Sequence, residues 1–468
     1  MQSVSIPASV TSIGLGVFQG CINLREIYVD PANPEYTTVD SILYNKSLTT
    51  LLACPAANTS IEIPSTVITI DALAFMNSKI STLDIPNSVT FIGAMAFLQC
   101  TELSSVTIPN SVATIKNGAF EDCKKLISVT IPGSIDTIDY STFSGCSALT
   151  NIDLPNSITC IRNMAFEGCS SLTSFFLPES VTTIDKWVFR GCAGLESVEI
   201  HNSVTSIGYM AFEGCSSLGT ITIPYSVTSI DHGAFENCVQ LDSVMIPNSI
   251  TSISNSLFKA CSGLTYIRIP DSVEEIGWDA FWGCTSLQSI SIPNSVTTIW
   301  GAAFRDCTGL ISIEIPNSVT YLGEEAFWGC SGLKTLILPE SDISIYDGAF
   351  RDCSGLTSIT CYALMPPEIG LEGVFDGVPK SIPLYVPGES IEAYQLADGW
   401  KEFMIITGIN SHISDKVRIY PNPSSGKLNI ATNNTGIAGS GLSYPGKRRQ
   451  QHRGGNLCDT AYGGITPF

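Results

Sequence analysis

The sequence predicts a solenoid in which repeats of 23 residues, each with parallel β-strands and a short helical turn, stack on one another. Three columns of identical residues carry this prediction. A proline column begins at Pro86, a phenylalanine column at Phe97 and a cysteine column at Cys100. The phenylalanine and cysteine columns return in twelve consecutive repeats, whereas His201 takes the place of one proline. Such a period is typical of units that bury their apolar faces only against their neighbours.

The repeat that begins at residue 103 illustrates the elements expected in each copy. The spacing of Leu103, Val106 and Ile108 predicts a strand with inward apolar side chains, and Pro109 ends it because proline donates no ladder hydrogen bond. Residues 112–115 predict a second short extended segment. Residues 118–123, with the sequence G-A-F-E-D-C, are too few for a long helix and predict one turn of α- or 3₁₀-helix.

The period defines where one part of the chain ends and the next begins. It is interrupted after residue 27, where residues 41–52 predict a hairpin around Asn45 and Lys46, and it fades after Cys353. A solenoid needs an atypical end unit. The predicted parts are a partial N-terminal repeat (1–27), an irregular repeat with the hairpin insertion (28–63), the regular array (64–360), a C-terminal cap (361–409), a linker with a short further segment (410–430) and a disordered or aberrant tail (431–468).

Composition argues against two kinds of partner. The 468 residues carry a net charge of −20, and an acidic surface repels phosphate backbones, so we expect no nucleic-acid partner. No run of 18 apolar residues is present, so we expect no membrane span. The chain starts inside a repeat and shows no signal peptide, from which we expect an incomplete N-terminus. The oligomeric state is left open.

The 17 cysteines raise the question of disulfides or zinc. Twelve of them recur once per repeat, and the paired C-x-x-C spacing of zinc sites is absent from the sequence. Successive thiols lie about 5 Å apart if each repeat adds one strand to a parallel ladder. We favour an inert column of buried thiols, since free cysteine behaves as a small apolar residue. Disulfides between neighbouring repeats remain the alternative.

The sequence offers little for catalysis, metal binding or cofactor binding. The four histidines are scattered, and the zinc-protease, nucleophile-elbow and phosphate-loop motifs are missing. Carboxylates in an outward strand column, such as Asp84, Asp153 and Glu314, belong to different repeats. A glycosidase would need two carboxylates at a defined separation in a cleft. We therefore expect a protein that is not an enzyme and takes no cofactor.

One departure from the repeat identifies a candidate binding surface. The position after the phenylalanine column reads Trp282, Arg305, Trp328 and Arg351 in four consecutive repeats. At about 5 Å per repeat, the guanidinium groups can interleave with the indole faces as a cation–π stack. Tryptophan and arginine are also enriched at binding hot spots. The candidate partner-binding patch comprises Trp278, Trp282, Trp300, Arg305, Trp328 and Arg351. The alternative is that the indoles only stabilise the turns.

The repeat pattern L-x-x-I-x-I-P-x-x-V-x-x-I-x-x-x-A-F-x-x-C resembles the BspA-type leucine-rich repeats of bacterial surface proteins. The resemblance covers about residues 3–360 and includes an insertion like that of residues 28–63. It implies a leucine-rich-repeat solenoid, a secreted or cell-surface location, and adhesion through binding of host proteins or neighbouring cells.

A second resemblance concerns residues 417–430, V-R-I-Y-P-N-P-S-S-G-K-L-N-I. This segment is similar to the opening of the C-terminal sorting domain used in Bacteroidetes type IX secretion. After Ile430 the chain departs from that pattern into Gly-, Ser- and Arg-rich sequence, so the resemblance implies a truncated sorting domain.

Three functions follow for testing. The first is a non-catalytic extracellular repeat protein that binds a protein or glycan partner. The second is a structural spacer or stalk, against which the lack of another complete domain counts. The third is a polysaccharide-acting enzyme, which requires a carboxylate pair in a groove.

Overall fold

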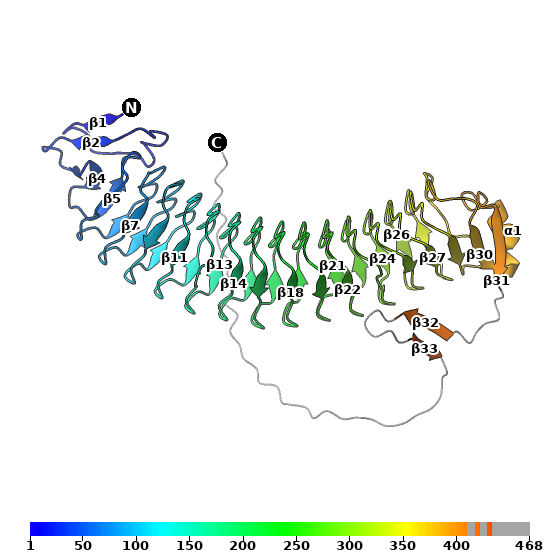
Figure 1. Cartoon of the computed structure of the whole chain (residues 1–468). Coiled ribbons are helices and arrows are strands. Elements are labelled where there is room, and N and C mark those ends of the chain that lie inside the picture. The colour runs from blue at the N-terminus through cyan, green and yellow to red at the C-terminus, as the bar shows by residue number, and fades with distance from the viewer. Residues whose placement is uncertain (410–416, 422–427, 433–468) are drawn as a thin grey trace, which may run out of the picture.

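The structure, a computed structural model, describes residues 1–409, 417–421 and 428–432. The repeats form a long, gently curved row in chain order from β7 to β30 (Figure 1). Each repeat is one rung, and equivalent residues of neighbouring rungs pair in parallel register. Ser105 pairs with Ser128, for example, and Val106 with Val129. The predicted solenoid of stacked 23-residue repeats is confirmed.

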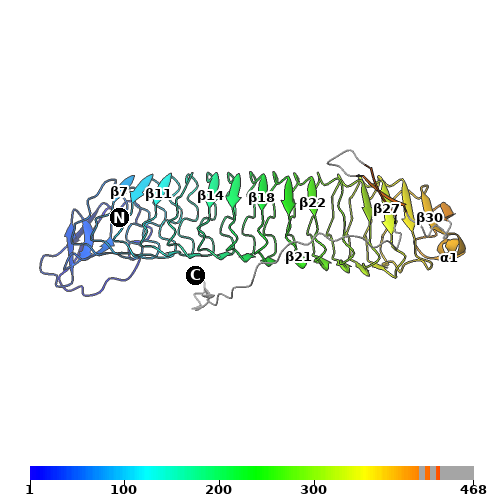
Figure 2. The same ribbon diagram turned by 90° about the horizontal axis from the view of Figure 1, so that it is seen from below.

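The first strand of each rung lies along one long edge of the row, as Figure 2 shows for β7, β11, β14, β18, β22 and β27. In each of the three-residue strands the central residue is buried, as Val106 is in β9. The first strands are β7 (Thr82–Asp84), β9 (Ser105–Thr107), β11 (Ser128–Thr130), β14 (Ser174–Phe176), β16 (Ser197–Glu199), β18 (Thr220–Thr222), β20 (Ser243–Met245), β22 (Tyr266–Arg268), β25 (Ser312–Glu314), β27 (Thr335–Leu338) and β29 (Ser358–Cys361).

The second strand of each rung has two residues, of which the last is buried. Figure 2 shows β21 on the edge opposite the first strands. These strands are β6 (Thr69–Ile70), β8 (Phe91–Ile92), β10 (Thr114–Ile115), β12 (Thr137–Ile138), β13 (Cys160–Ile161), β15 (Thr183–Ile184), β17 (Ser206–Ile207), β19 (Ser229–Ile230), β21 (Ser252–Ile253), β23 (Glu275–Ile276), β24 (Thr298–Ile299), β26 (Tyr321–Leu322) and β28 (Ser344–Ile345).

The turn after each second strand is not the predicted helical turn. Two residues per rung, four positions apart, have left-handed backbone angles, such as Gly118 (φ 62°) and Asp122 (φ 58°). A right-handed helix cannot contain them. The amides of Gly118, Phe120 and Asp122 instead donate to carbonyls of the next rung at 2.8, 2.9 and 2.7 Å. The turn therefore forms its own ladder between rungs, because every second amide points along the array.

The core is built from columns of identical residues. Phenylalanine rings stack continuously from Phe75 to Phe375, with centroids of neighbouring rungs 4.9 to 5.9 Å apart. Each cysteine of the column is a buried free thiol, and its S–H donates to a phenylalanine carbonyl of the preceding rung, as Cys123 does to Phe97 at 3.2 Å. Burial raises the pKa of Cys192 to about 12. These are the properties of an inert thiol column.

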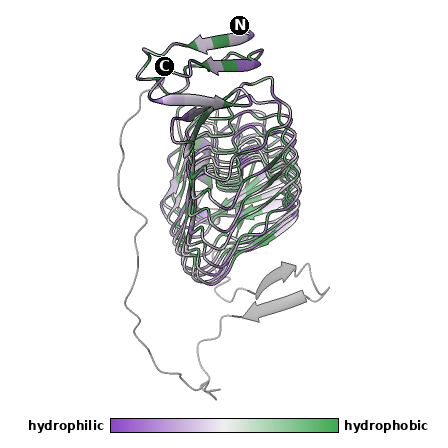
Figure 3. Ribbon diagram, turned by 90° about the vertical axis from the view of Figure 1, so that its left-hand side faces the viewer, coloured by the Kyte–Doolittle hydropathy of each residue, from purple (hydrophilic) through white to green (hydrophobic). Residues whose placement is uncertain are grey.

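The N-terminal rung is separated from this core. Strands β1 (Ser3–Ile6) and β2 (Glu26–Val29) pair with each other, and an antiparallel meander of β3 (Tyr36–Val39), β4 (Ile42–Asn45) and β5 (Thr50–Ala53) joins them to β6. The meander contains the hairpin around Asn45 and Lys46 and adds β3, which the sequence did not indicate. A small separate cluster forms around Leu24 and Ile27. Seen from its end, the row of rungs lies apart from β1 and β2 (Figure 3).

The last described part of the array contains residues 361–409. Strands β30 (Pro383–Pro387) and β31 (Ile405–Ile409) continue the parallel ladder from β29. Between them lie a 3₁₀-helix, η1 (Gly388–Ser390), and the helix α1 (Ile391–Leu396). The Tyr394 hydroxyl donates to the Ala363 carbonyl at 2.9 Å, and the Trp400 indole N–H to the Pro367 carbonyl at 3.1 Å. That this unit caps the solenoid stays a prediction.

The sorting-domain-like segment lies only partly in the described chain. Strands β32 (Val417–Pro421) and β33 (Leu428–Thr432) pair antiparallel, whereas residues 422–427 lie outside the described residues. The truncated sorting domain therefore stays a prediction, as does the nature of the tail at 433–468.

Candidate partner-binding surface

Four of the six residues in the candidate patch form one stack. Lys259 Nζ lies 4.5 Å from the centroid of the Trp282 ring, and Arg305 Cζ lies 4.9 Å from the same ring. Arg305 Cζ also lies 4.1 Å from the Trp328 ring, and Arg351 Cζ lies 5.1 Å from it. The predicted interleaving of guanidinium and indole groups is confirmed, and Lys259 extends it by one rung. We call these five residues the cation–π ladder.

The polar groups of the cation–π ladder are largely paired within the molecule. The Trp282 indole N–H donates to Asp306 at 3.1 Å, and the Trp328 indole N–H to Asp352 at 2.9 Å. Arg305 forms an ion pair with Glu325 at 2.5 Å, and its side chain is only 26% exposed. Because both faces of each indole are covered by cations, the interior of this ladder offers no open ring to a ligand. The alternative that these indoles stabilise the turns therefore gains support.

Trp278 and Trp300 belong to a different stack. Their ring centroids lie 6.0 Å apart, Trp300 lies 5.3 Å from Tyr321, and Tyr321 lies 4.6 Å from Tyr346. The end rings are open to solvent, with Trp278 41% and Tyr346 39% exposed. We call these four residues the aromatic row. The sequence analysis missed Tyr321 and Tyr346, because the four rings do not share one column of the repeat.

Local geometry fixes the aromatic row in place. The Trp278 ring lies directly over Gly301, where an added Cβ would overlap the indole carbons. The Trp300 indole N–H donates to Glu275 at 3.0 Å. Burial, followed by the charges of Tyr346 and Glu324, raises the pKa of Tyr321. The row therefore presents ordered, neutral aromatic surface at neutral pH, which suits contact with apolar protein side chains or sugar rings.

Towards the N-terminus the column of the cation–π ladder becomes acidic. Arg190 lies between two carboxylates, 3.4 Å from Glu167 and 2.7 Å from Glu213. Burial raises the pKa of Glu121, and the charges of Asp122 and Glu167 raise it further. The column thus changes from carboxylates to cations and indoles along its length.

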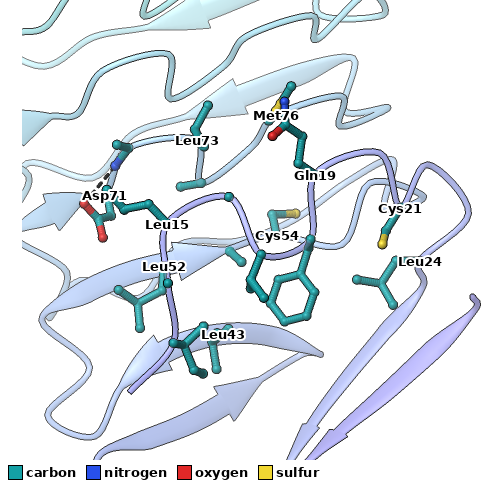
Figure 4. A pocket seen from close by; sticks show the side chains of 18 of the residues that line it. Leu15, Gln19, Cys21, Leu24, Leu43, Leu52, Cys54, Asp71, Leu73 and Met76 are labelled. Carbon is teal, nitrogen blue, oxygen red and sulfur yellow. Dashed lines mark hydrogen bonds between the residues drawn. The ribbon is translucent and has the colours of Figure 1, made fainter. Parts of the chain in front are cut away.

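A cavity of about 80 Å³ lies where the N-terminal rung meets the rung of Leu73 (Figure 4). Its lining is mainly apolar, with Leu15, Leu43 and Leu52 among the residues drawn, and Asp71 is the one carboxylate that lines it. That carboxylate accepts the Ala72 amide at 2.8 Å. Within residues 1–409, histidine, cysteine and acidic side chains nowhere gather in a group of three that could hold a metal. The cavity therefore lacks the carboxylate pair that the polysaccharide-acting enzyme requires.

The repeat also matches a known protein family. The family model described as BspA type leucine-rich repeat region, in 6 copies, matches residues 1–52, 54–150, 140–265 and 251–365. The chain belongs to the BspA-type leucine-rich repeat family. Its members are repeat proteins, and neither this match nor the structural neighbours indicate a catalytic function. No curated protein matches the chain. In its described part, no helix is long and apolar enough to cross a bilayer.

Solved structures support the same fold for this BspA-type chain. A leucine-rich repeat protein from Bacteroides ovatus is 26% identical, with 87% of this chain and 92% of that chain covered and a TM-score of 0.55. A leucine-rich cell surface protein from Faecalibacterium prausnitzii is 27% identical, with coverage of 80% and 99% and a TM-score of 0.46. A leucine-rich repeat protein from Eubacterium ventriosum is 33% identical, with coverage of 46% and 58% and a TM-score of 0.43.

Proposed function

We propose that this BspA-type protein is a non-catalytic, extracellular or cell-surface repeat protein that binds a protein or glycan partner. The observation that carries the proposal is the aromatic row of Trp278, Trp300, Tyr321 and Tyr346, whose end rings are exposed. Ordered rings with open faces are costly to leave in water and provide large contact area with little loss of side-chain entropy. The adjacent cation–π ladder supports the row as a rigid framework.

The location is proposed from family membership and from the sequence similarity to surface proteins. Export by type IX secretion is proposed from residues 417–430 alone. The spacer function is the second candidate, and the length of the regular array favours it.

The test is binding of the full chain to a glycan array and to immobilised extracellular-matrix proteins. The informative variant is Trp278→Ala/Tyr346→Ala, which removes the two open rings, and the matched control is Tyr225→Ala, which removes an equally exposed ring elsewhere on the array. We expect one partner to bind the wild type and the control alike, and to lose at least about tenfold in affinity for the double variant, as hot-spot residues do.

A second variant, Trp282→Ala/Trp328→Ala, separates binding from support. We expect it to lower the unfolding midpoint more than it lowers affinity. Binding that survives the Trp278→Ala/Tyr346→Ala change would reject the aromatic row as the site. Absence of binding across the whole panel would favour the spacer function.

A further inference from the structure

Phe176 is exposed in a column where most rungs carry small or charged residues. Its counterparts on other rungs include Thr107, Thr130 and Thr222, yet the Phe176 side chain is 67% exposed. The preceding residue, Phe175, is buried and packs edge-on against Phe166 and Phe189 with centroids 5.0 and 4.7 Å away. Phe175 therefore fills the core of this rung, and packing gives no reason for a second phenylalanine on the outside.

An open groove of about 530 Å³ lies beside Phe176. Leu154, Pro178, Glu179 and His201 help to line it, and His201 is the residue that interrupts the proline column. Three departures from the repeat, at residues 175, 176 and 201, thus meet at one place. Because they lie in two consecutive rungs and share one groove, they point to a selected surface and not to scattered drift in the repeat.

The ladder of first strands is interrupted at this groove. The Thr173 amide lies 3.5 Å from the Thr150 carbonyl, whereas the equivalent distance one rung later, from Glu196 to Thr173, is 2.9 Å. Asp153 pairs with Thr130 through an isolated bridge, and β14 pairs with β16. The rungs of residues 153 and 176 are thus separated at their outward face, which gives the groove its opening.

The surroundings of the groove are acidic. The outward neighbours of Phe176 on the two flanking rungs are Asp153 and Glu199, and Glu199 pairs with Phe176 in the strand register. The three first-strand segments 150–158, 173–181 and 196–204 contain four carboxylates and no lysine or arginine. In the described part of the chain none of these carboxylates forms an ion pair. An aromatic face between unpaired carboxylates is complementary to a cation with an apolar stem.

We propose that this groove is a second interaction site, independent of the aromatic row, that accepts an arginine side chain of a partner protein. The guanidinium plane lies on the Phe176 ring, where its N–H groups reach Asp153 and Glu199. The aliphatic stem and the neighbouring apolar residue of the partner contact Leu154 and Pro178. Arginine fits this site better than lysine, because its planar group stacks on the ring and binds carboxylates in a bidentate manner at the same time.

The probe for this site is a fluorescently labelled peptide, acetyl-Ser-Leu-Arg-Leu-Ser-amide, titrated against the full chain at pH 8 and about 50 mM salt, an ionic strength at which exposed charges are weakly screened. A matched peptide carries citrulline, which has nearly the shape of arginine but no charge. The variant is Phe176→Thr, which restores the residue found on other rungs. The control is Met245→Thr, which removes an exposed apolar side chain from the same column three rungs away.

We expect the wild type and Met245→Thr to bind the arginine peptide equally, and Phe176→Thr or Asp153→Asn/Glu199→Gln to lose at least fivefold in affinity. The citrulline peptide should bind at least fivefold more weakly to the wild type. Equal binding of the two peptides, equal binding by Phe176→Thr, an equal loss in Met245→Thr, or no binding by the wild type would each overturn the proposal. None of these results bears on the aromatic row, which is tested by its own variants.

Discussion

The guanidinium of Arg305 lies between two indoles, with its Cζ 4.1 Å from the Trp328 ring and 4.9 Å from the Trp282 ring. This arrangement joins three rungs through side chains outside the core. We expect Arg305→Met to keep the aliphatic volume but lose both cation–π contacts and the ion pair with Glu325. The loss should be about 1–3 kcal/mol. Urea unfolding followed by tryptophan fluorescence measures it.

Arg351→Met is the matched control for this change. Arg351 covers one face of Trp328 and is exposed, so its loss should be about half as large or less. Equal effects of the two substitutions would show that the sandwich of Arg305 adds nothing to stability.

Gly301 leaves room for the Trp278 ring, which lies over its α-carbon. We expect Gly301→Ala to displace the indole and to destabilise the array by about 1–3 kcal/mol, as overpacking does. In the double variant Gly301→Ala/Trp278→Ala the overlap is gone, so the two changes should cost less together than their sum. A double-mutant cycle by urea unfolding measures this, and strict additivity would contradict the contact.

The cysteine column should resist alkylation in the native protein. Burial raises the pKa of Cys192, Cys261 and Cys307 to about 12, and the thiolate is the reactive form. We expect iodoacetamide at pH 8 to label the half-buried Cys21 and Cys160 first, and the twelve column thiols only after unfolding. Mass spectrometry of labelled peptides measures this. Native labelling of Cys215, or disulfide-linked peptides from neighbouring rungs, would contradict the thiol column.

Glu121 should make the array less stable at neutral pH than at acidic pH. Burial and the charges of Asp122 and Glu167 raise its pKa above the value in the unfolded chain. The folded state therefore holds its proton more tightly, and stability falls as the pH rises from the unfolded pKa through the folded one. We expect Glu121→Gln to raise stability at pH 7 by about 0.5 kcal/mol, the scale of partly solvated charges.

The advantage of Glu121→Gln should shrink on acidification and vanish below about pH 4, where the wild-type carboxyl is also protonated. Thermal unfolding at a series of pH values measures the difference. Glu274→Gln, at an exposed position, is the control and should show no comparable gain at pH 7. A gain that persists at low pH would rule out the charge as its cause.

Much of the fold follows from the sequence because parallel stacking repeats each environment. Val106, Phe120 and Cys123 occupy columns whose members all meet the same neighbours, so periodicity alone identifies the core. The same argument brought Trp282 and Arg305 together, since both lie in one column. It could not place Trp278 beside Tyr321, because ring orientation and rung-to-rung offset decide that contact.

Two other features depend on backbone geometry that residue types do not reveal. The left-handed positions of each turn are held by Met210 and Asp279 as well as by glycines, so the glycine pattern did not expose them. The groove at Phe176 exists because neighbouring first strands separate there, which is a property of packing between rungs. A single outward phenylalanine in a sequence is ordinary, and only the separation of strands around it gives it meaning.

The phenylalanine stack begins at Phe75, and within residues 1–409 Phe18 lies outside it. A pulling force applied along the row would therefore meet unequal resistance. The rungs from Phe75 onwards share load through ring stacks, thiol bonds and three backbone ladders, whereas the N-terminal strands are held by a small cluster around Leu24 and by the meander. We expect that segment to extend first under tension, as an elastic lead before a stiff rod.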